Sequence, residues 1–380
     1  MKIDFTLRLP KKISFGAGRF ETLAEEANLL AASGKVLCVL DPAVRPVLWP
    51  RIEKTALAGR AVNLEIPAGE PTVEAVDRAA ETARAVNPEL VIGIGGGSAM
   101  DFAKALAALI ENPGSSEEYR GQDRLKKPCR PKIMVPTTAG TGSEISPTAV
   151  LIGGGRKGGI NSPDLIPETA LLDPELTLDL PAPVTVASGL DAFCHALESY
   201  LSVRSTPFSE PLSLQALELL VRGLPAALAA PGDLPARTDN LLGSLLAGIT
   251  LASAGVIANH SLSYPLGARH GIGHGLANGI MLPYVVRACL PEAAEKLAKV
   301  ADRLGVAPGA SVSERAVRTA DFIFEFEARL GFKHRLRDLG VRAEELEAMA
   351  AEASQVAVPI ANTPRPMNVA ELAEIYRKAY

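Results

Sequence analysis

The chain has 380 residues, enough for two or three domains of ordinary size. Its 47% hydrophobic and 22% charged residues are typical of a globular protein and argue against disorder. A net charge of −4 and an aromatic content of 4% supply neither the positive charge nor the stacking side chains of a nucleic-acid-binding protein, so we expect no nucleic-acid partner.

The first half of the chain alternates short apolar runs with stretches of helical periodicity. The periodicity predicts helices over 73–86 and 99–110. The apolar runs predict buried strands over 35–40, 90–94, 133–135 and 170–172. Strands that alternate with helices are typical of a parallel sheet covered on both faces. We therefore expect an α/β nucleotide-binding domain over residues 1–183.

After Leu180-Pro181-Ala182-Pro183 the periodicity is helical, which predicts an all-α domain over residues 184–380. One stretch of this half, 241–258, has 18 residues without a charge, close to the roughly 20 apolar residues that a membrane span needs. Because glycine and hydroxyl residues interrupt it, we expect a buried helix of the domain that ends at His260, and no membrane partner.

The four cysteines are spread along the chain without a Cys-x-x-Cys pair. They are Cys38, Cys129, Cys194 and Cys289. This spacing offers no zinc ribbon and no disulfide framework, which is typical of cytoplasmic proteins. The first ten residues lack the apolar core of a signal peptide. We expect a cytoplasmic location.

A glycine-rich loop, Gly95-Gly96-Gly97-Ser98, follows the predicted strand over 90–94 and opens a helix. Glycines let a backbone approach a phosphate closely, and a helix N-terminus presents unpaired N–H groups. The spacing of Ser98 and Asp101 is also that of a self-capped helix. The loop is therefore either a phosphate site or a tight, capped turn.

A second polar loop follows the next predicted strand, where residues 136–144 read PTTAGTGSE. Hydroxyl groups and amides at the carboxyl end of a strand suit a nucleotide, and they equally suit hydroxyl-capped turns. Asp41, at the end of the strand over 35–40, either faces an adenosine ribose or is a turn residue before Pro42. Two such loops at successive strand ends favour the nucleotide.

The histidines are scarce and clustered, with four of the five between positions 195 and 274. Asp191 and His195 lie four apart in a helical stretch, so both side chains share one helix face. His260 follows the uncharged stretch, and His274 comes after a glycine-rich turn over 267–273. Imidazole and carboxylate ligands without thiolate suit iron(II), zinc or manganese. The alternative is a set of structural histidines, and we expect His334 on the surface.

Six motifs occur in order along nearly the whole chain. They are GGGSAMDFAK at 95–104, PTTAGTGSE at 136–144, SPDLIPETALLDPEL at 162–176, SGLDAFCHALESY at 188–200, HSLSYPLGARHGIGHGLANGIMLPYV at 260–285 and NTPRP at 362–366. As an ordered set they resemble the iron-containing (group III) alcohol dehydrogenase family, which shares its fold with dehydroquinate synthase and glycerol dehydrogenase. The resemblance implies that fold, an α/β domain followed by an all-α domain.

The resemblance also implies two cofactors. The first is a divalent metal, typically Fe²⁺ with Zn²⁺ or Mn²⁺ as alternatives, held by Asp191, His195, His260 and His274. The second is NAD(H), since Asp41 matches the position whose carboxylate disfavours NADP(H). The other matching cofactor positions are Gly96, Gly97, Ser98, Thr137, Thr138, Thr141, Ser146 and Lys157.

The chain departs from the family pattern at Tyr264, where many relatives carry a histidine that is thought to relay a proton to solvent. His270 is a candidate catalytic substitute, because a free imidazole pKa near 6.5 suits proton transfer at neutral pH. The alternative is a surface histidine.

The resulting hypothesis is a homodimeric alcohol dehydrogenase or aldehyde reductase that transfers hydride between nicotinamide and a small alcohol or aldehyde. Arg269, between two metal ligands, either binds an anionic group on the substrate or forms a surface salt bridge. Two other functions remain open, a metal-dependent lyase of the dehydroquinate synthase type and a non-catalytic metal- and nucleotide-binding homologue.

Overall fold

The computed structural model describes residues 5–332 and 335–380, so the expectation for His334 lies outside the described residues. The described chain divides into two compact units. The α/β unit is Arg8–Asp179, and the helical unit is Leu180–Tyr380 together with residues 5–7. The predicted change from the α/β to the all-α pattern lies at 183.

The α/β unit is built on a six-stranded sheet with the order β1-β9-β6-β4-β2-β3, in which every pairing is parallel. A three-stranded sheet, β5-β8-β7, accompanies it. The strands are β1 (Lys12–Phe15), β2 (Val36–Leu40), β3 (Ala61–Glu65), β4 (Leu90–Gly95), β5 (Gly121–Gln122), β6 (Lys132–Pro136), β7 (Thr148–Gly153), β8 (Arg156–Asn161) and β9 (Thr169–Leu172). The helices are α1 (Leu23–Leu30), α2 (Arg45–Ile52), α3 (Val73–Val86), α4 (Gly97–Glu111) and α5 (Ser116–Tyr119). Short 3₁₀ turns lie at Arg19–Thr22, Pro163–Leu165 and Pro174–Thr177.

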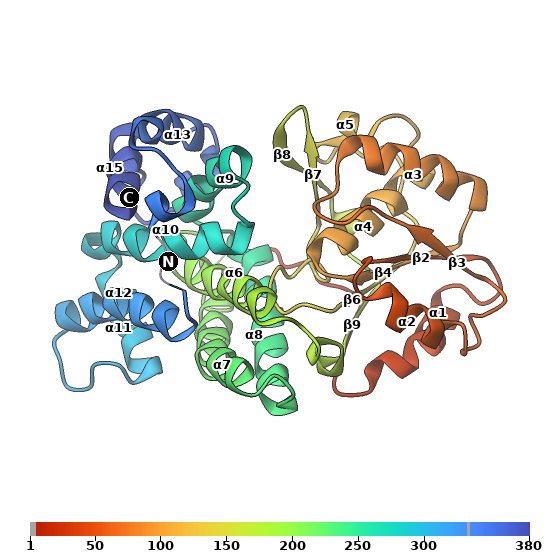
Figure 1. Cartoon of the computed structure of the whole chain (residues 1–380), viewed down its shortest axis with the longest axis horizontal. Coiled ribbons are helices and arrows are strands. Elements are labelled where there is room, and N and C mark those ends of the chain that lie inside the picture. The colour runs from red at the N-terminus through yellow and green to blue at the C-terminus, as the bar shows by residue number, and fades with distance from the viewer. Residues whose placement is uncertain (1–4, 333–334) are drawn as a thin grey trace. The chain divides into compact units, whose positions relative to one another are not determined.

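The central strands are apolar along their whole length because helices cover both faces of the sheet. In β2, Leu37 and Val39 belong to one core with α3 and α4, whereas Cys38 and Leu40 belong to another with α1 and α2. Figure 1 shows these two helix pairs on opposite sides of the sheet. The parallel sheet with both faces covered is therefore confirmed.

The four predicted strands and two predicted helices are present, and α3 has the predicted bounds. The edge strands β1 and β3 and the β7–β8 hairpin were not predicted. Gly154 and Gly155 join β7 to β8 with φ of 57° and 71°. Two adjacent residues with positive φ form the turn that suits a hairpin, and a Gly-Gly pair is its sequence signal.

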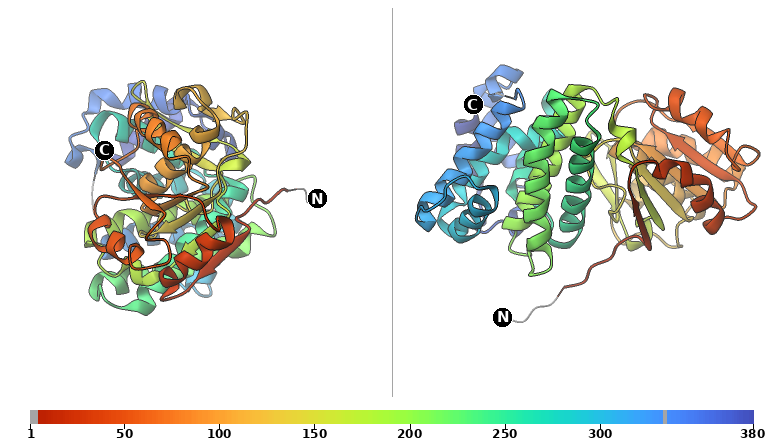
Figure 2. Two further views of the ribbon diagram at one scale, coloured as in Figure 1. Left: turned by 90° about the vertical axis from the view of Figure 1, so that its right-hand side faces the viewer. Right: turned by 90° about the horizontal axis from the view of Figure 1, so that it is seen from below.

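The helical unit contains ten α-helices in its described part and confirms the all-α prediction for the second half of the chain. They are α6 (Ala182–Leu201), α7 (Ser209–Ala229), α8 (Leu234–Ala254), α9 (Ala258–His270), α10 (His274–Ala288), α11 (Leu290–Leu304), α12 (Val312–Arg329), α13 (Leu346–Ala353), α14 (Ala357–Asn362) and α15 (Val369–Ala379). Two 3₁₀ turns lie at Leu336–Leu339 and Ala343–Glu345. Helices α6, α7 and α8 pack side by side (Figure 2).

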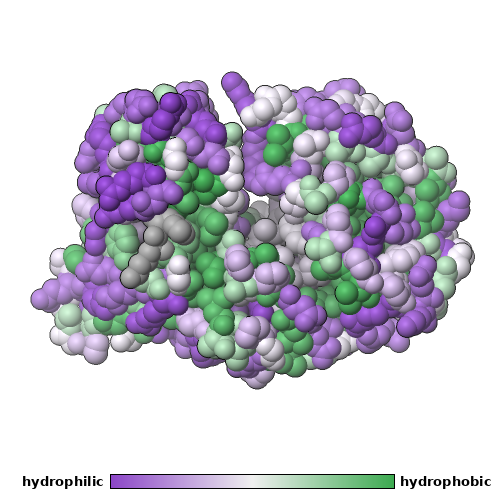
Figure 3. All heavy atoms as spheres, in the orientation of Figure 1, coloured by the Kyte–Doolittle hydropathy of each residue, from purple (hydrophilic) through white to green (hydrophobic). Residues whose placement is uncertain are grey.

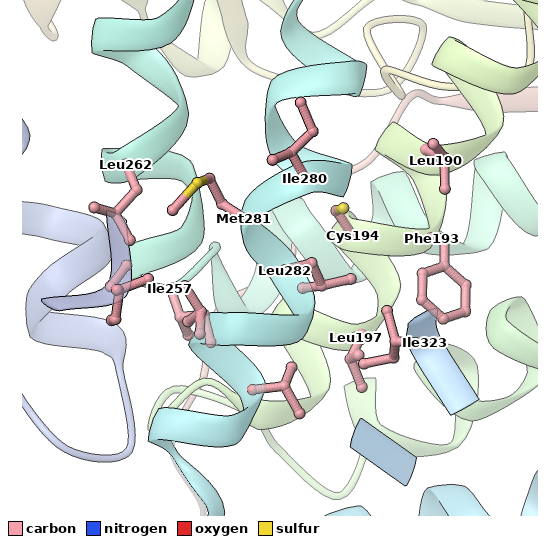
Figure 4. Close-up of a cluster of buried hydrophobic side chains, with 14 of the residues drawn as sticks. Leu190, Phe193, Cys194, Leu197, Ile257, Leu262, Ile280, Met281, Leu282 and Ile323 are labelled. Carbon is pink, nitrogen blue, oxygen red and sulfur yellow. The ribbon is translucent and has the colours of Figure 1, made fainter. Parts of the chain in front are cut away.

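The core of this unit forms where α6, α9, α10 and α12 meet. Figure 4 shows Leu190, Phe193 and Leu197 of α6 in one apolar cluster with side chains of α10 and with Ile323 of α12. These residues are at most 2% exposed, so α6 is fixed along one face by apolar packing. Its polar face is thereby held in position.

The uncharged stretch over 241–258 is not one helix, which corrects the sequence analysis. Helix α8 ends at Ala254, Gly255 has a φ of 69°, and α9 begins at Ala258. His260 therefore lies in the first turn of a new helix and does not end the old one. The expected turn over 267–273 is also shorter, because α9 continues to His270 and only residues 271–273 separate it from α10.

One helix of the described chain, α7, is long and apolar enough to cross a membrane, and the α8–α9 pair, bent by 108°, would meet the same criterion as a single span. A core helix of a bundle also has this composition. Helix α7 packs against both α6 and α8, and α8 buries much of its length. This packing agrees with a buried helix for residues 241–254 of the predicted stretch 241–258.

Candidate metal centre and nucleotide loops

Three helices of the helical unit bring the four predicted metal ligands together. Asp191 and His195 lie one turn apart on α6, with the Asp191 Oδ1 atom 3.7 Å from His195 Nε2. His274, the first residue of α10, places Nε2 3.9 Å from the same Oδ1. The ligand atoms of Asp191, His195 and His260 all lie within 4.8 Å of one another. Such a cluster has the chemistry and spacing of a metal site.

His260 is oriented by Glu198, which is not among the predicted site residues. The Nδ1 atom of His260 lies 2.8 Å from Glu198 Oε1, and Glu198 is fully buried. Because a carboxylate only accepts, the Nδ1–H of His260 is the donor. A neutral imidazole with its proton on Nδ1 carries its lone pair on Nε2, the nitrogen available to a metal.

Asn278 of α10 reaches the centre of the cluster. Its Nδ2 atom lies 2.9 Å from Asp191 Oδ1, 3.1 Å from His260 Nε2 and 3.3 Å from His274 Nε2. An amide nitrogen only donates and carries two N–H groups, so at most two of these three atoms accept from it at once; His260 Nε2 is an acceptor, because the ring proton of His260 lies on Nδ1. Metal ligands need that protonation state, and the residues present therefore fit a divalent ion.

The electrostatics of Asp191 also suit a cation. Burial acts to raise the pKa of Asp191, but positive charge on the rings of His195, His274 and His260 and the hydrogen bond from the Asn278 amide outweigh it and hold the pKa below its ordinary value. When the imidazoles are neutral, a bound cation would supply that positive charge. The carboxylate is thus ionised and ready to bind a positive charge.

Tyr264, where many relatives carry a histidine, stacks on His274 with ring centroids 5.8 Å apart. Burial raises the pKa of Tyr264 to about 12. The phenol therefore keeps its proton at neutral pH and does not exchange it as an imidazole does.

Cys194 lies between Asp191 and His195 in the sequence, but its side chain is not part of the metal cluster. Its side chain belongs to the apolar cluster of Figure 4. Burial raises the pKa of the Cys194 thiol well above its ordinary value, so it stays protonated. The residue is part of the core, and the oxygen and nitrogen ligands account for the site.

The glycine loop of the α/β unit is a strained turn that only glycine makes without cost. Gly95 has a φ of 150°, and a Cβ there would lie 2.6 Å from Asp41 Cβ and 2.8 Å from Ala99 Cβ. Gly96 is the N-cap of α4 and makes no side-chain cap, so the first N–H groups of the helix have no partner within the helix. The self-capped turn is therefore wrong, and Ser98 lies inside the first turn.

The Asp101 side chain does not cap α4; it accepts hydrogen bonds from the second loop and from β7. Its Oδ1 atom accepts from Ser143 Oγ at 2.5 Å, and its Oδ2 atom accepts from Val150 N at 3.1 Å. Lys104, fully buried, lies 3.1 Å from Asp101 and donates to Ser143 O and Ser146 Oγ. Burial lowers the pKa of Lys104. These bonds hold the second loop beside the first.

The predicted cofactor positions meet at this edge of the sheet, with the exception of Lys157. Thr137 N donates to Gly95 O, Thr138 lies over Gly96, and Thr141 lies so close to Gly97 that a Cβ there would be 2.7 Å from Thr141 Cγ2. Ser146 is already engaged by Lys104. Lys157, on β8, forms an ion pair with Glu70.

Asp41 follows β2 directly, next to the glycine loop on the neighbouring strand β4. Its backbone N–H donates to Ile94 O, and its Oδ1 accepts from Ala43 N at 2.9 Å, the contact of a turn aspartate. Asp41 therefore makes the contact expected of a turn residue, but this contact uses only one of its two carboxylate oxygens, Oδ1.

The structure does not bring His270 to the metal cluster. It ends α9, ten residues or about 15 Å of helix rise beyond His260, and its Nε2 lies 3.7 Å from Glu345 Oε2. Arg269 donates to both carboxylate oxygens of Glu352. The surface over α13 and α15 is strongly hydrophilic (Figure 3), and both ion pairs connect α9 to that region. The salt-bridge interpretation of Arg269 is the one that the geometry supports.

Two residues of the metal site, Glu198 and Asn278, were missed, and both carry a sequence signal. Glu198 follows His195 by three positions and Asn278 follows His274 by four. Residues three and four apart share a helix face, so a polar side chain at this distance from a predicted ligand is a candidate partner.

Comparisons with known proteins cover both halves of the chain. A model of the iron-containing alcohol dehydrogenases matches residues 10–174, and a model of the C-terminal region of the Fe-containing alcohol dehydrogenase family matches residues 185–380. The long-chain-alcohol dehydrogenase 1 of Geobacillus thermodenitrificans is 34% identical over 96% of this chain and 94% of its own.

Solved structures give the same result. A 1,3-propanediol oxidoreductase superposes with a TM-score of 0.95 at 30% identity, over 99% of this chain and 100% of its own. The sulfoacetaldehyde reductase of Bifidobacterium kashiwanohense, solved with NAD⁺, superposes with a TM-score of 0.90 at 28% identity, over 100% of this chain and 99% of its own. The chain belongs to the iron-containing alcohol dehydrogenase family.

Proposed function

We propose that this protein is a metal-dependent, NAD(H)-linked alcohol dehydrogenase or aldehyde reductase for small alcohols and aldehydes. The observation that carries the proposal is the convergence of Asp191, His195, His260 and His274, whose atoms carry the charge and lone pairs that a divalent ion requires. Family membership favours a dehydrogenase over a dehydroquinate synthase-like lyase. The complete ligand set argues against a non-catalytic homologue.

The proposed metal is Fe²⁺, with Zn²⁺ and Mn²⁺ as alternatives that the same ligand types accept. When bound, such an ion supplies Lewis-acid polarisation of the substrate oxygen. The protein's own contribution is to keep Asp191 ionised and His260 in one tautomer before any ligand arrives. This preorganisation lowers the cost of binding both metal and substrate.

The proposed nucleotide site is the edge formed by the glycine loop and residues 137–146, and the nicotinamide of NAD(H) would supply or accept the hydride. The unpaired N–H groups at the start of α4 suit a pyrophosphate, and Asp41 beside Gly95 suits ribose hydroxyls and repels a 2′-phosphate. The family-derived role of Lys157 requires its ammonium group to leave Glu70, whereas the Ser146 hydroxyl can accept from Lys104 and bind a further group.

A neutral substrate is favoured over an anionic one, because Arg269 is held by both oxygens of Glu352. The sulfoacetaldehyde reductase among the similar structures keeps the anionic class worth testing. We expect kcat/KM for propanal to exceed that for sulfoacetaldehyde, and the reverse order would assign the anionic substrate. Arg269→Gln is expected to leave the ratio of the two values unchanged.

The remaining proposals concern the whole protein. We propose that the α/β unit carries the nucleotide and the helical unit the metal, that the protein is a homodimer, and that it acts in the cytoplasm. Size-exclusion chromatography with light scattering tests the dimer, since a monomeric mass would contradict it.

The proposed activity is tested by NADH oxidation with short aldehydes under anaerobic conditions, in metal-free protein and after addition of Fe²⁺. We expect turnover only with the metal and almost none for Asp191→Asn. Asp239→Asn, which removes a partly buried carboxylate paired with Arg222 and outside the metal cluster, is the matched control and is expected to keep full activity. Full activity of rigorously metal-free protein would rule the proposal out.

A further inference from the structure

Glu198 is a buried carboxylate whose partners all come from the start of α9. Its side chain is 0% exposed. Glu198 Oε2 accepts from Ile257 N at 2.9 Å, and Oε1 accepts from Asn259 Nδ2 and from His260 Nδ1, both at 2.8 Å. A buried carboxylate is costly unless such donors compensate it, so its place depends on this segment.

The position of Glu198 excludes it as a further ligand of the same cluster. It lies on the face of α6 that carries Asp191 and His195, but both of its oxygens are turned toward donors of α9. His260 therefore stands between two groups, with Glu198 on its Nδ1 side and the cluster on its Nε2 side. A carboxylate that accepts the Nδ1–H fixes the ring's tautomer and increases the basicity of Nε2.

We propose that Glu198 is a positioning residue for the metal, which sets the tautomer, orientation and donor strength of His260. This inference rests on the proposed function, because it assigns Glu198 a role toward the metal of that same site. Asn259 supports the arrangement, since its Nδ2 joins Glu198 Oε1 to Asn278 O and so ties α6, α9 and α10 together.

A purely structural role is the competing explanation, because Glu198 also holds the backbone of the α8–α9 turn. The C-terminal motif at 362–366 holds the same turn by other contacts. Thr363 Oγ1 accepts from Ala258 N at 3.0 Å, and Asn362 Nδ2 donates to Val256 O at 3.1 Å. Thr363 contacts the turn but not the His260 ring, so a substitution at Thr363 distinguishes the two explanations.

The experiment compares the metal affinity of Glu198→Gln and Thr363→Val with that of the unsubstituted protein. Glutamine at this position keeps the size of the side chain but removes the negative charge that accepts the His260 Nδ1–H, and its amide nitrogen opposes at least one of the three donors. Metal-free proteins are titrated with Co²⁺ alone against a chelating dye, and the visible spectrum of bound Co²⁺ is recorded. We expect the Kd of Glu198→Gln to rise about 10- to 100-fold with a changed spectrum. Thr363→Val is expected to keep Kd and spectrum while unfolding at a lower temperature.

A second measurement needs no substitution. With only five histidines in the chain, [¹⁵N]histidine labelling gives an assignable spectrum, in which metal-free His260 is expected to carry its proton on Nδ1. A proton on Nε2, or equal losses of affinity in the two variants, would overturn the proposal. If the unsubstituted protein binds Co²⁺ and Glu198→Gln binds it with the same Kd and spectrum, the role of Glu198 is refuted and the proposed function is not. Absence of binding to the unsubstituted protein would refute the proposed function as well.

Discussion

Three buried carboxylates at the candidate sites, Asp101, Asp191 and Glu198, each accept a hydrogen bond from an element other than their own. Removal of one member of such a buried pair costs more than the pair contributes, because the other member is left buried without compensation. These residues therefore set the geometry of the loops and helices around them. Glu144 is different, because burial raises its pKa to about 7 and outweighs the opposing effects of its own backbone N–H and of the Lys104 charge.

The raised pKa of Glu144 predicts a pH-dependent stability. Since the folded pKa of about 7 exceeds the ordinary value of 4.5, the protonated form favours folding. This stability is fully present below pH 4.5 and is lost as the pH rises through 7, a difference of about 3 kcal/mol. Glu144→Gln is expected to flatten the dependence of the unfolding midpoint between pH 5 and pH 8. Glu117→Gln, at an exposed carboxylate, is the control, and equal slopes for Glu144→Gln and the unsubstituted protein would contradict the argument.

The placement of His270 predicts the outcome of its removal. Because the residue faces Glu345 at the end of α9, His270→Ala is expected to leave the pH dependence of kcat/KM unchanged, and because its side chain is largely buried, to lower stability by roughly 1–2 kcal/mol. The pH–rate profiles of the two proteins, measured from pH 5.5 to pH 9, provide the test. Loss of the basic or acidic limb in His270→Ala would restore the relay role that the sequence suggested.

At the scale of elements, the helices and strands that the sequence predicts correctly are those with a clear local pattern. The run Val36–Leu40 and the period of Val73–Val86 each identify their element without knowledge of the rest of the chain. The break between α8 and α9 was missed because apolar residues continue across it and only the positive φ of Gly255 marks it. A single glycine in a helical pattern does not distinguish an interior position from a helix end.

The candidate site also has a part that the sequence predicts and a part that only the fold reveals. A metal cluster was predicted from residue type and spacing, the family resemblance implied its four ligands, and the structure brings these four residues together. The pairing of Asp101 with Ser143 and of Thr363 with Ala258 joins residues 42 and 105 positions apart, and no local pattern encodes such a partner. The sequence thus indicated the chemistry of the site, whereas the supports of the site required the fold.

The glycine loop yields a prediction at this scale, because adjacent glycines differ in what a methyl group would meet. Gly95→Ala places a Cβ 2.6 Å from Asp41 Cβ at a φ of 150°, whereas Gly96→Ala places one no closer than 3.5 Å to Thr138 at a φ of −73°. We expect Gly95→Ala to destabilise the protein by roughly 2–4 kcal/mol, and Gly96→Ala by less than about 1 kcal/mol. Thermal unfolding without nucleotide measures both, and equal destabilisation would show that the loop adapts.

At the scale of the whole molecule, each candidate site lies within one compact unit. All four metal ligands belong to Leu180–Tyr380, and the glycine loop and the second loop belong to Arg8–Asp179. Each unit also has its own apolar core, so each site is supported by packing that the other unit does not supply. A ligand that binds only the folded site stabilises the elements that form it.

This separation predicts distinct patterns of hydrogen exchange for the two ligands. Addition of Fe²⁺ to metal-free protein is expected to slow exchange in α6 and at the starts of α9 and α10, by up to about 100-fold at 100 times the Kd. Addition of NADH without metal is expected to slow exchange at the start of α4 and in residues 137–146. Mass spectrometry of peptides from both units measures the effects, with Asp191→Asn as the control that removes the metal pattern and keeps the NADH pattern. Protection of the glycine loop by metal alone would show that the two sites are not supported independently.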